Sequence, residues 1–395
     1  MAYLQRGDDL KKFKFIDLFS GIGGFHQAMV QLGGECVFAS EIDKYAIETY
    51  YENYGIDSSC NIRDIDEKDI PKHDVLCGGF PCQAFSKAGK QAGMSDTRGT
   101  LFFEIERILK YHKTKYIVLE NVRNLVSHDN GNTWKTIHEH LKAIGYRLTP
   151  VPIIISPHQF GIPQLRERVV ILGIYDSEHV DEELEIEFTD LISKDHNSIY
   201  SILDNDVVED KYYLNQKEIQ VLTAWDEFYK GIKEKVIGFP IWAEYFIDKD
   251  EEEDFPDWKK EFVRKNKCLY YNNRTFIDKW LKKYDNLSSF TPTQRKMEWQ
   301  AGDSIESVWD AVIQFRPSGI RVKKPTCFPA LVAIVQVPII GKYKRRLTVR
   351  EAARLQSFPE SFKPNADDHQ AYKQFGNAVN VEVIKRAAQK LFEIQ

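Results

Sequence analysis

The chain lacks the long apolar runs and the cysteine pairs that mark membrane, zinc-binding or disulfide-linked proteins. No stretch approaches the length of a membrane span, and residues 1–14 contain no apolar signal segment. The six cysteines, at positions 36, 60, 77, 82, 268 and 327, form no C-x-x-C motif. We therefore expect a cytoplasmic protein with reduced thiols, no metal site and no membrane contact.

An excess of positive charge is also absent, since the formal net charge of the 395 residues is -5. That value alone argues against a nucleic-acid partner, because phosphate contacts need local positive potential. The charge is unevenly distributed, however. Residues 311–350 contain nine Lys or Arg and no Asp or Glu. Taken alone, such a run favours a solvated face.

Strand and helix patterns alternate over the first 175 residues. Expected strands cover 13–19, 36–41, 75–78, 116–120 and 169–174, and expected helices cover 25–32, 44–54, 101–111 and 133–144. Such alternation predicts an α/β fold with a doubly wound, mostly parallel sheet.

The pattern changes after residue 180. Acidic runs alternate there with aromatic segments, and six of the seven tryptophans lie between positions 225 and 309. This is too much aromatic surface for a disordered linker. Helical patterns return at 350–356 and 381–392. We expect a first domain at 1–180, a smaller irregular α+β domain at 181–346, and a segment at 347–395 that returns to the first domain.

Cys82 stands out because it follows the buried strand and the motif Gly-Gly-Phe-Pro at 78–81. Open α/β sheets place their chemistry at the carboxyl ends of the strands. Pro81 fixes φ and removes a backbone donor, which favours a stiff turn. We expect the Cys82 thiol to be presented, not buried in a helix or a sheet.

Two further strand ends provide candidate polar groups. The turn at 17–24, Asp-Leu-Phe-Ser-Gly-Ile-Gly-Gly, would let a nucleoside cofactor approach the backbone, and position 26 is His, so the dinucleotide fingerprint is incomplete. Glu41 could accept bonds from ribose hydroxyls and Asp64 could accept an adenine amino group. A helix cap or loop role is as probable for either carboxylate alone.

Glu120 follows the strand 116–119 and should reach the same crevice as Cys82. A carboxyl near a thiol favours nucleophilic attack with acid assistance, whereas a lone Glu at this place is equally consistent with a helix cap. Arg166 and Arg168 share one side of an extended segment. As an isolated pair they are more typical of salt bridges on an edge strand.

Seven motifs in this order resemble those of the bacterial DNA (cytosine-5) methyltransferases of type II restriction-modification systems. They are Phe-Ser-Gly-Ile-Gly-Gly (19–24), Gly-Gly-Phe-Pro-Cys-Gln (78–83), Asp-Thr-Arg-Gly-Thr-Leu-Phe (96–102), Glu-Asn-Val (120–122), Gln-Leu-Arg-Glu-Arg (164–168), Arg-Glu-Ala-Ala-Arg-Leu-Gln-Ser-Phe-Pro (350–359) and Gln-Phe-Gly-Asn-Ala-Val (374–379). The resemblance covers roughly 13–175 and 346–395, and it implies a Rossmann-like S-adenosylmethionine-dependent fold.

The resemblance also implies roles for individual residues. Cys82 would be the nucleophile, Glu120 the acid at the pyrimidine edge, and Arg168 a contact to the cytosine carbonyl with Arg166 beside it. S-adenosylmethionine, with S-adenosylhomocysteine as product, would be bound by Phe19, Gly21, Gly23, Glu41, Ile42, Asp64, Ile65, Pro81, Leu101 and Asn377.

Double-stranded DNA is the implied substrate, with a cytosine flipped out of the helix. The segment 87–98 is a candidate lid, and 181–346 would be the target-recognition domain. The residues expected to contact DNA are Ser86, Lys87, Arg98, Arg316, Ser318, Arg321 and Lys323. We expect a bacterial monomer, with a cognate restriction endonuclease as a possible partner.

Three other functions compete with this interpretation. A cytosine-5 methyltransferase acting on tRNA shares the motifs, although the tryptophan-rich insert and the basic run favour duplex DNA. A non-catalytic DNA-binding protein would not need a thiol beside a carboxyl. A dehydrogenase is disfavoured by the incomplete glycine fingerprint.

Overall fold

The chain folds into two compact units in a computed structural model that describes residues 12–80, 101–189, 191–193, 198–207, 209–246, 255–333 and 336–394. Unit 1 comprises Met1–Asn197, Ala330–Ile334 and Ala352–Gln395. Unit 2 comprises Ser198–Pro329 and Val335–Glu351. The boundary near the C-terminus falls within helix α9, Val349–Leu355.

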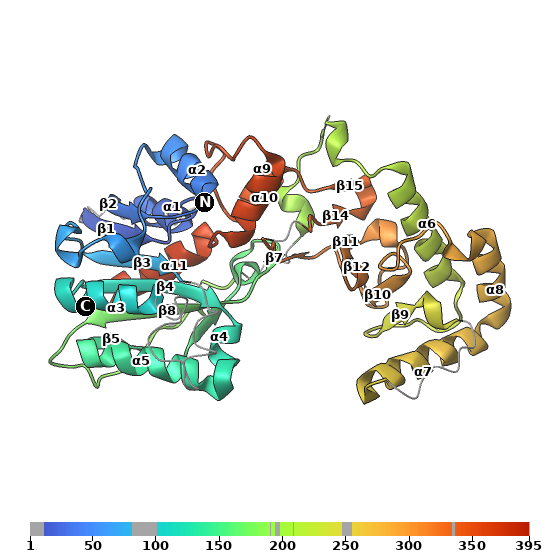
Figure 1. Cartoon of the computed structure of the whole chain (residues 1–395), viewed down its shortest axis with the longest axis horizontal. Coiled ribbons are helices and arrows are strands. Elements are labelled where there is room, and N and C mark those ends of the chain that lie inside the picture. The colour runs from blue at the N-terminus through green and yellow to red at the C-terminus, as the bar shows by residue number, and fades with distance from the viewer. Residues whose placement is uncertain are drawn as a thin grey trace. The chain divides into compact units, whose positions relative to one another are not determined.

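Unit 1 is built on a seven-stranded sheet (Figure 1). The order along the sheet is β2-β1-β3-β4-β8-β5, and β6 also pairs with β8. The strands are β1 (Phe13–Leu18), β2 (Gly34–Ser40), β3 (Val75–Gly79), β4 (Tyr116–Val122), β5 (Tyr146–Leu148), β6 (Ile153–Ile155) and β8 (Arg168–Tyr175), while the short β7 (Gln164–Leu165) lies outside this sheet. The first four strands in this order are parallel, as the alternating pattern predicts.

Helices cover both faces of this sheet, because successive side chains of a strand point to opposite faces. Ile16, Leu18 and Leu119 join one core cluster with α3 (Leu101–His112) and α5 (Asn132–Ile144). Helix α11 (Val381–Phe392) contacts β4, β8 and α1 (Gly24–Gln31). The remaining helices of unit 1 are α2 (Lys44–Tyr54), α4 (Asn124–Ser127) and α10 (Asp368–Asn377). The observed layers are those of a Rossmann-like methyltransferase.

Strand β8 departs from the parallel pattern, since it runs antiparallel to β4, β5 and β6. Its apolar run, Val169 to Ile174, is buried on both faces. Such a run looks the same in the sequence whichever way the strand points. The antiparallel direction brings the amino end of β8, and therefore Arg168, beside the carboxyl end of β4.

Unit 2 contains a six-stranded sheet of order β15-β14-β11-β12-β10-β9, which is more regular than the sequence pattern suggests. Its elements are α6 (Gln216–Gly231), β9 (Pro240–Trp242), α7 (Asp257–Asn272), α8 (Arg274–Lys283), β10 (Lys296–Gln300), β11 (Val312–Arg316), β12 (Gly319–Lys323), β13 (Phe328–Pro329, outside this sheet), β14 (Ile339–Ile340) and β15 (Arg345–Arg346). Trp225, Trp280 and Trp299 are fully buried in its core. The aromatic content of this region thus builds a folded unit.

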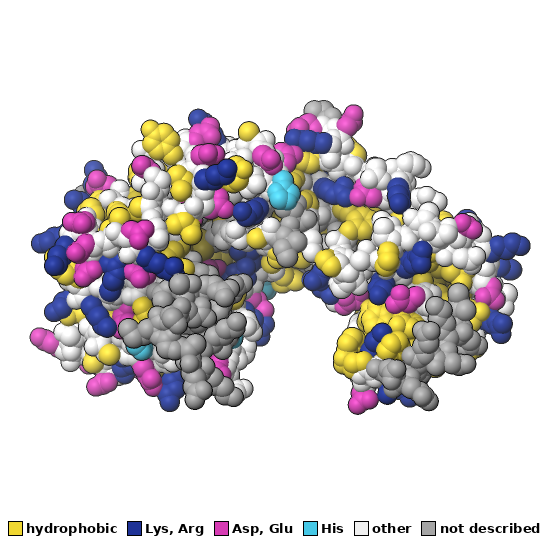
Figure 2. All heavy atoms as spheres, in the orientation of Figure 1, with side chains coloured by type: hydrophobic (Ala, Val, Ile, Leu, Met, Phe, Trp, Pro, Cys, Tyr) yellow, Lys and Arg dark blue, Asp and Glu magenta, His cyan; other side chains and the backbone are white. Residues whose placement is uncertain are grey.

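The surface of the chain shows no obvious division by charge in the view of Figure 2, where Lys and Arg are interspersed with Asp and Glu. Among the described residues, no helix is both long and apolar enough to cross a membrane. The same residues contain no group of three or more His, Cys, Asp or Glu suited to a metal ion.

Candidate active site

The carboxyl ends of β3 and β4 meet at one edge of the sheet in unit 1. Gly79, the last residue of β3, is in register with Glu120 on β4. The buried Asn121 side chain donates a hydrogen bond of 2.8 Å to the Phe80 carbonyl, and this bond ties the two strand ends together. The chain therefore leaves β3 at Gly79, next to Glu120 and three residues before Cys82 in the sequence.

Five of the expected site residues lie outside the described residues. They are Pro81, Cys82, Ser86, Lys87 and Arg98, and the candidate lid at 87–98 lies there too. Their roles stay predictions. What the structure provides is the position of their described neighbours, above all Phe80, whose side chain packs in the core with 3% of its surface exposed.

Glu120 and Arg168 form an ion pair across β4 and β8. The distance between Arg168 Nε and Glu120 Oε1 is 3.0 Å, and only 20% and 13% of the two side chains is exposed. Arg168 is in register with Val122, so it lies diagonally from Glu120 on the same face of the sheet. The antiparallel β8 thus creates a pair that a parallel strand would not.

The electrostatics of this pair shift the pKa of the Glu120 carboxyl upward. Burial raises the pKa of Glu120 above its ordinary value, while Arg168 and Arg166 act in the opposite direction and offset only part of that effect. A carboxyl in this state can donate a hydrogen bond or a proton at a higher pH than an exposed glutamate can. Glu120 therefore has the property that acid assistance requires.

Arg166 has a different environment from Arg168, although the two are separated by one residue. Its guanidinium donates to the carbonyls of Leu331 at 2.8 Å, Gly376 at 3.1 Å and Ala378 at 2.9 Å. Only 3% of the residue is exposed, and burial together with Arg168 lowers its pKa to about 9. Because these bonds go to the backbone, Arg166 holds the surrounding segments in place; it lies near Glu120 without bonding to it.

A small cavity of unit 1 is lined by both arginines and by Glu120. Its other lining residues are Pro157, Val379, Asn380, Val383 and Ile384. The apolar wall contributed by α11 and the segment before it explains why the carboxyl of Glu120 is poorly hydrated.

The loop after β1 and Glu41 form a second site at the same edge of the sheet. Glu41 Oε2 accepts a hydrogen bond of 2.8 Å from the Gly21 amide, and Oε1 accepts from the amides of Ile42 and Asp43 at 2.7 and 2.9 Å. Three amides hold this carboxylate in one orientation. Glu41 is consequently prepared to bind further hydroxyl donors.

The conformation of this loop explains the glycines. Phe19, Gly21 and Gly23 all have positive φ values, of 56°, 53° and 84°. A Cβ at position 23 would lie 2.3 Å from the Tyr54 ring, whereas a Cβ at position 21 would meet no atom within 4 Å. Gly23 is needed for packing, and Gly21 borders open space that a ligand can use.

The remaining expected cofactor residues lie on separate elements. Asp64 and Ile65 are at the end of the 3-10 helix Ile62–Asp64, Leu101 begins α3, and Asn377 ends α10. Ile65 and Phe19 pack against the same core cluster, and Ile42 has 75% of its surface exposed. No hydrogen bond among the described residues connects Asp64 or Asn377 to Glu41, so the structure joins directly only Gly21, Ile42 and Glu41.

One residue with a clear role at the site was not predicted. Asn121 fixes the end of β4 through its bond to the Phe80 carbonyl and by accepting from the Val122 amide at 2.9 Å. The motif Glu-Asn-Val already contains it, and an amide directly after a buried strand is the signal that could have identified it.

The four expected DNA contacts in unit 2 lie on the hairpin of β11 and β12. Arg316 ends β11, Ser318 lies in the turn, and Arg321 and Lys323 are on β12. Arg321 forms an ion pair with Glu298, at 2.7 Å between Nη2 and Oε2.

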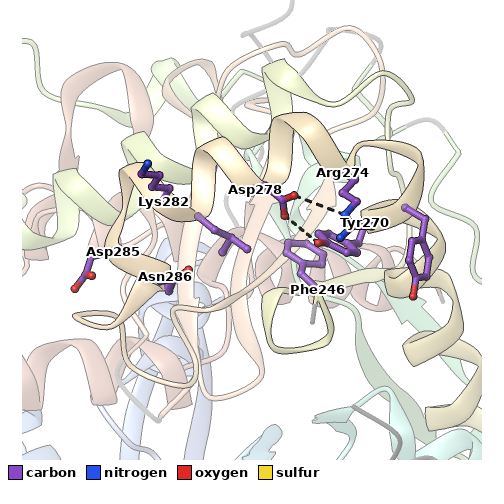
Figure 3. Close-up of a pocket in the computed structure, with 9 residues that line it drawn as sticks. Phe246, Tyr270, Arg274, Asp278, Lys282, Asp285 and Asn286 are labelled. Carbon is purple, nitrogen blue, oxygen red and sulfur yellow. Dashed lines mark hydrogen bonds and ion pairs between the residues drawn. The ribbon is translucent and has the colours of Figure 1, made fainter. Parts of the chain in front are cut away.

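A separate pocket of about 480 Å³ in unit 2 is shown in Figure 3. Phe246, residues of α7 and α8, and Asn286 line it, and Asp278 accepts a hydrogen bond of 2.9 Å from the Tyr270 hydroxyl. Asp278 also lies 3.7 Å from Arg274 Nε. None of the expected site residues lines this pocket.

Comparison with known proteins gives a consistent result. The profile of the C-5 cytosine-specific DNA methylases matches residues 13–393. The type II methyltransferase M.AluI of Cellulosimicrobium cellulans is 33% identical, with 95% of this chain and 91% of that protein covered. M.HpaII of Haemophilus parainfluenzae is 36% identical, covering 97% and 90%. The methyltransferase EhMeth of Entamoeba histolytica has a similar fold, with a TM-score of 0.58, 18% identity, and 97% and 98% covered.

Proposed function

The chain belongs to the C-5 cytosine-specific DNA methylase family and methylates cytosine in DNA at C5, and we propose that Cys82, Glu120 and Arg168 carry out the chemistry. The observation that supports this proposal most directly is the poorly hydrated carboxyl of Glu120, whose pKa is raised and which lies in register with Gly79, the strand end after which Cys82 follows in the sequence. Sequence-specific methylation is the activity of the type II family.

Cytosine C5 is a poor nucleophile, and the proposed residues overcome this in a defined order. The Cys82 thiolate adds to C6, and the ring electrons move toward N3 and C5. Glu120, whose pKa is raised by burial, donates a proton to N3 and so accepts the developing charge. C5 then becomes the nucleophilic carbon.

Completion of the reaction reverses these steps. After methylation of C5, a base removes the C5 proton, the C6–sulfur bond breaks, and the thiolate of Cys82 leaves. The N3 proton returns to Glu120. Arg168, held by its 3.0 Å bond to Glu120, directs its remaining N–H groups toward the O2 carbonyl of the cytosine in this proposal.

We propose S-adenosylmethionine as the methyl donor. When bound, it supplies the methyl group as an activated sulfonium. The residues present fit such a ligand: the fixed carboxylate of Glu41 can accept the two ribose hydroxyls, Gly21 leaves room for the ligand, and Asp64 is exposed for an amino group. Leu101, Ile42 and Asn377 complete the proposed pocket.

The target atom of a stacked duplex is inaccessible, so the cytosine must be flipped out of the helix. We assign the reaction to unit 1, because Glu120, Arg168 and Glu41 all lie in it, and sequence recognition to unit 2. One catalytic unit and one recognition unit suffice to methylate a cytosine on one DNA strand. We therefore propose that the enzyme acts as a monomer, alongside a cognate restriction endonuclease.

The proposal is tested by trapping the covalent intermediate. A duplex that contains 5-fluorocytosine at the target position cannot lose a C5 proton, so with S-adenosylmethionine it should remain attached to the enzyme through Cys82. The wild type and Cys268→Ala, which changes an exposed thiol of α7, should give an adduct that survives denaturation. Cys82→Ala should give none and should transfer no methyl group. An adduct with Cys82→Ala, or its absence in the wild type, would refute the assignment.

A further inference from the structure

One face of strands β10, β12 and β11 in unit 2 is apolar and buried. Met297, Trp299, Ile313, Ile320 and Val322 pack there against the helices of the unit. Since side chains alternate along a strand, the residues between them belong to the opposite face. We call this opposite face the polar sheet face; its polar side chains are Lys296, Glu298, Gln300, Gln314, Arg316, Arg321 and Lys323.

Arg321 lies at the middle of the polar sheet face. It is in register with Glu298 on β10 and with Gln314 on β11. Its Nε and Nη2 both donate to Glu298 Oε2, at 3.0 and 2.7 Å. Gln300 donates to the other oxygen, Oε1, of the same carboxylate. Glu298 is thus held from two sides, and it holds one edge of the guanidinium.

The other edge of this guanidinium is available. Within the described part of the chain, no acceptor is found for Arg321 Nη1, and 25% of the side chain is exposed. Two parallel N–H groups on a fixed guanidinium match the O6 and N7 atoms of guanine in the major groove. A carboxylate that orients the arginine from behind reduces the entropy lost on binding.

Two more cations surround this pair. Arg316 and Lys323 are half-buried, and among the residues that the structure describes neither forms an ion pair with a carboxylate. Burial, with repulsion from Arg321, lowers the pKa of both. Arg316, Arg321 and Lys323 repel one another with only Glu298 pairing among them, and an anion would relieve that repulsion. Phosphate groups are the anions that duplex DNA provides.

A purely structural salt bridge between neighbouring strands explains these contacts less well. Such a pair needs no further cations, yet Arg316 and Lys323 add uncompensated charge to the same face. We propose that the polar sheet face reads DNA directly, with Arg321 bonding a guanine of the recognised sequence, Glu298 positioning Arg321, and Arg316 and Lys323 holding phosphates. This inference rests on the proposed role of unit 2 in DNA recognition.

The experiment selects duplexes from a pool of randomised sequence and reads those retained by each variant of the full chain. The wild type should enrich sequences with guanine at a fixed position. Arg321→Lys keeps the charge and loses the paired N–H groups, so its preference for that guanine should fall by about 5- to 150-fold while its total DNA affinity is kept. The control Lys279→Ala, which changes an exposed cation of α8, should select the same sequence as the wild type.

Two further variants separate reading from phosphate binding. Glu298→Gln removes a negative charge near phosphates, so affinity for all sequences should rise while the preference for guanine falls. Lys323→Ala should weaken binding to all sequences alike. It should also reduce, by about 1, the slope of the logarithm of DNA affinity against the logarithm of salt concentration. A merely structural role of Glu298 would instead lower affinity for every sequence with an unchanged preference.

The inference is overturned if the selected sequence contains no fixed guanine, or if Arg321→Lys retains the full preference for it. Because the selection measures binding alone, its result does not depend on methyl transfer. A failure of Cys82 to form an adduct would leave the selection readable, and a failure of the selection would leave the adduct experiment readable.

Discussion

Two glutamate–arginine pairs, one in each unit, show how the surroundings decide the role of the same chemical group. In unit 2, Glu351 is fully buried and accepts four hydrogen bonds: two from Arg345, at 2.7 and 2.8 Å, and one each from the amides of Asp204 and Thr348, both at 2.8 Å. In unit 1, Glu120 has its ion pair with Arg168 and a poorly hydrated carboxyl.

The difference lies in the number of donors. Both oxygens of Glu351 are occupied by protein groups, so its carboxylate is a fixed structural anion that joins β15, α9 and the chain at Asp204. Glu120 has too few donors to compensate for its burial, which is why its pKa is raised. A poorly hydrated carboxyl with too few hydrogen-bond donors to stabilise its charge is therefore a candidate acid, whereas one with donors on both oxygens is a structural anion.

The largest expected effect comes from removing the acid. Glu120→Gln cannot transfer a proton to N3, and we expect kcat to fall by about 10²- to 10⁴-fold with DNA binding preserved. Methyl transfer to duplex DNA under single-turnover conditions measures this. The control is Glu167→Gln, an exposed carboxylate that pairs with Arg123, for which turnover should be unchanged. Equal turnover of Glu120→Gln and the wild type would contradict the proposed acid.

The second effect is on stability and concerns the structural pair. Glu351→Gln leaves the charge of Arg345 buried without a counterion, which should cost about 3–5 kcal/mol of the stability of unit 2. Tryptophan fluorescence during urea unfolding reports this unit, because six of the seven tryptophans lie at positions 225–309.

The matched control for that measurement is Glu218→Gln. Glu218 pairs with Arg346, the neighbour of Arg345, and the Arg346 side chain is 29% exposed. This pair is closer to solvent than the fully buried pair of Glu351 and Arg345, so its loss should cost less. Equal losses in both variants would show that the surroundings of Glu351 are not special.

The smallest expected effect is on pH dependence. Because the pKa of Glu120 is raised in the folded chain, methylation that needs its proton should decline as the pH rises through that pKa, and Glu120→Gln should lack this decline. The free energy of unfolding should change in the same direction, falling as the pH rises. The contribution of Glu120 is fully present below its unfolded pKa and is lost as the pH rises through the folded pKa. Unfolding midpoints of the wild type and of Glu120→Gln across pH should therefore diverge toward neutral pH; a constant difference would contradict the raised pKa.

Much of unit 1 could be predicted from local patterns. The expected helices at 44–54 and 101–111 correspond to α2 and α3, because their apolar residues recur at helical spacing and Asp43 caps α2. Helix α10 was not predicted, since its polar composition, with Gln370 and Lys373, resembles a loop. An α+β domain was expected at 181–346, but the positions of its strands were not predicted, because these strands are as short as two residues and pair with strands far along the chain.

The amino-acid order alone determined the family, the alternating α/β pattern and the identity of the candidate groups, because strand ends and glycine turns are local features that a motif preserves. Only the tertiary structure decided that β8 runs antiparallel, that Arg168 meets Glu120 while Arg166 bonds backbone carbonyls, and that Glu298 orients Arg321. These contacts join residues far apart in the chain. Their geometry and burial depend on how the strands pair, which no local pattern specifies.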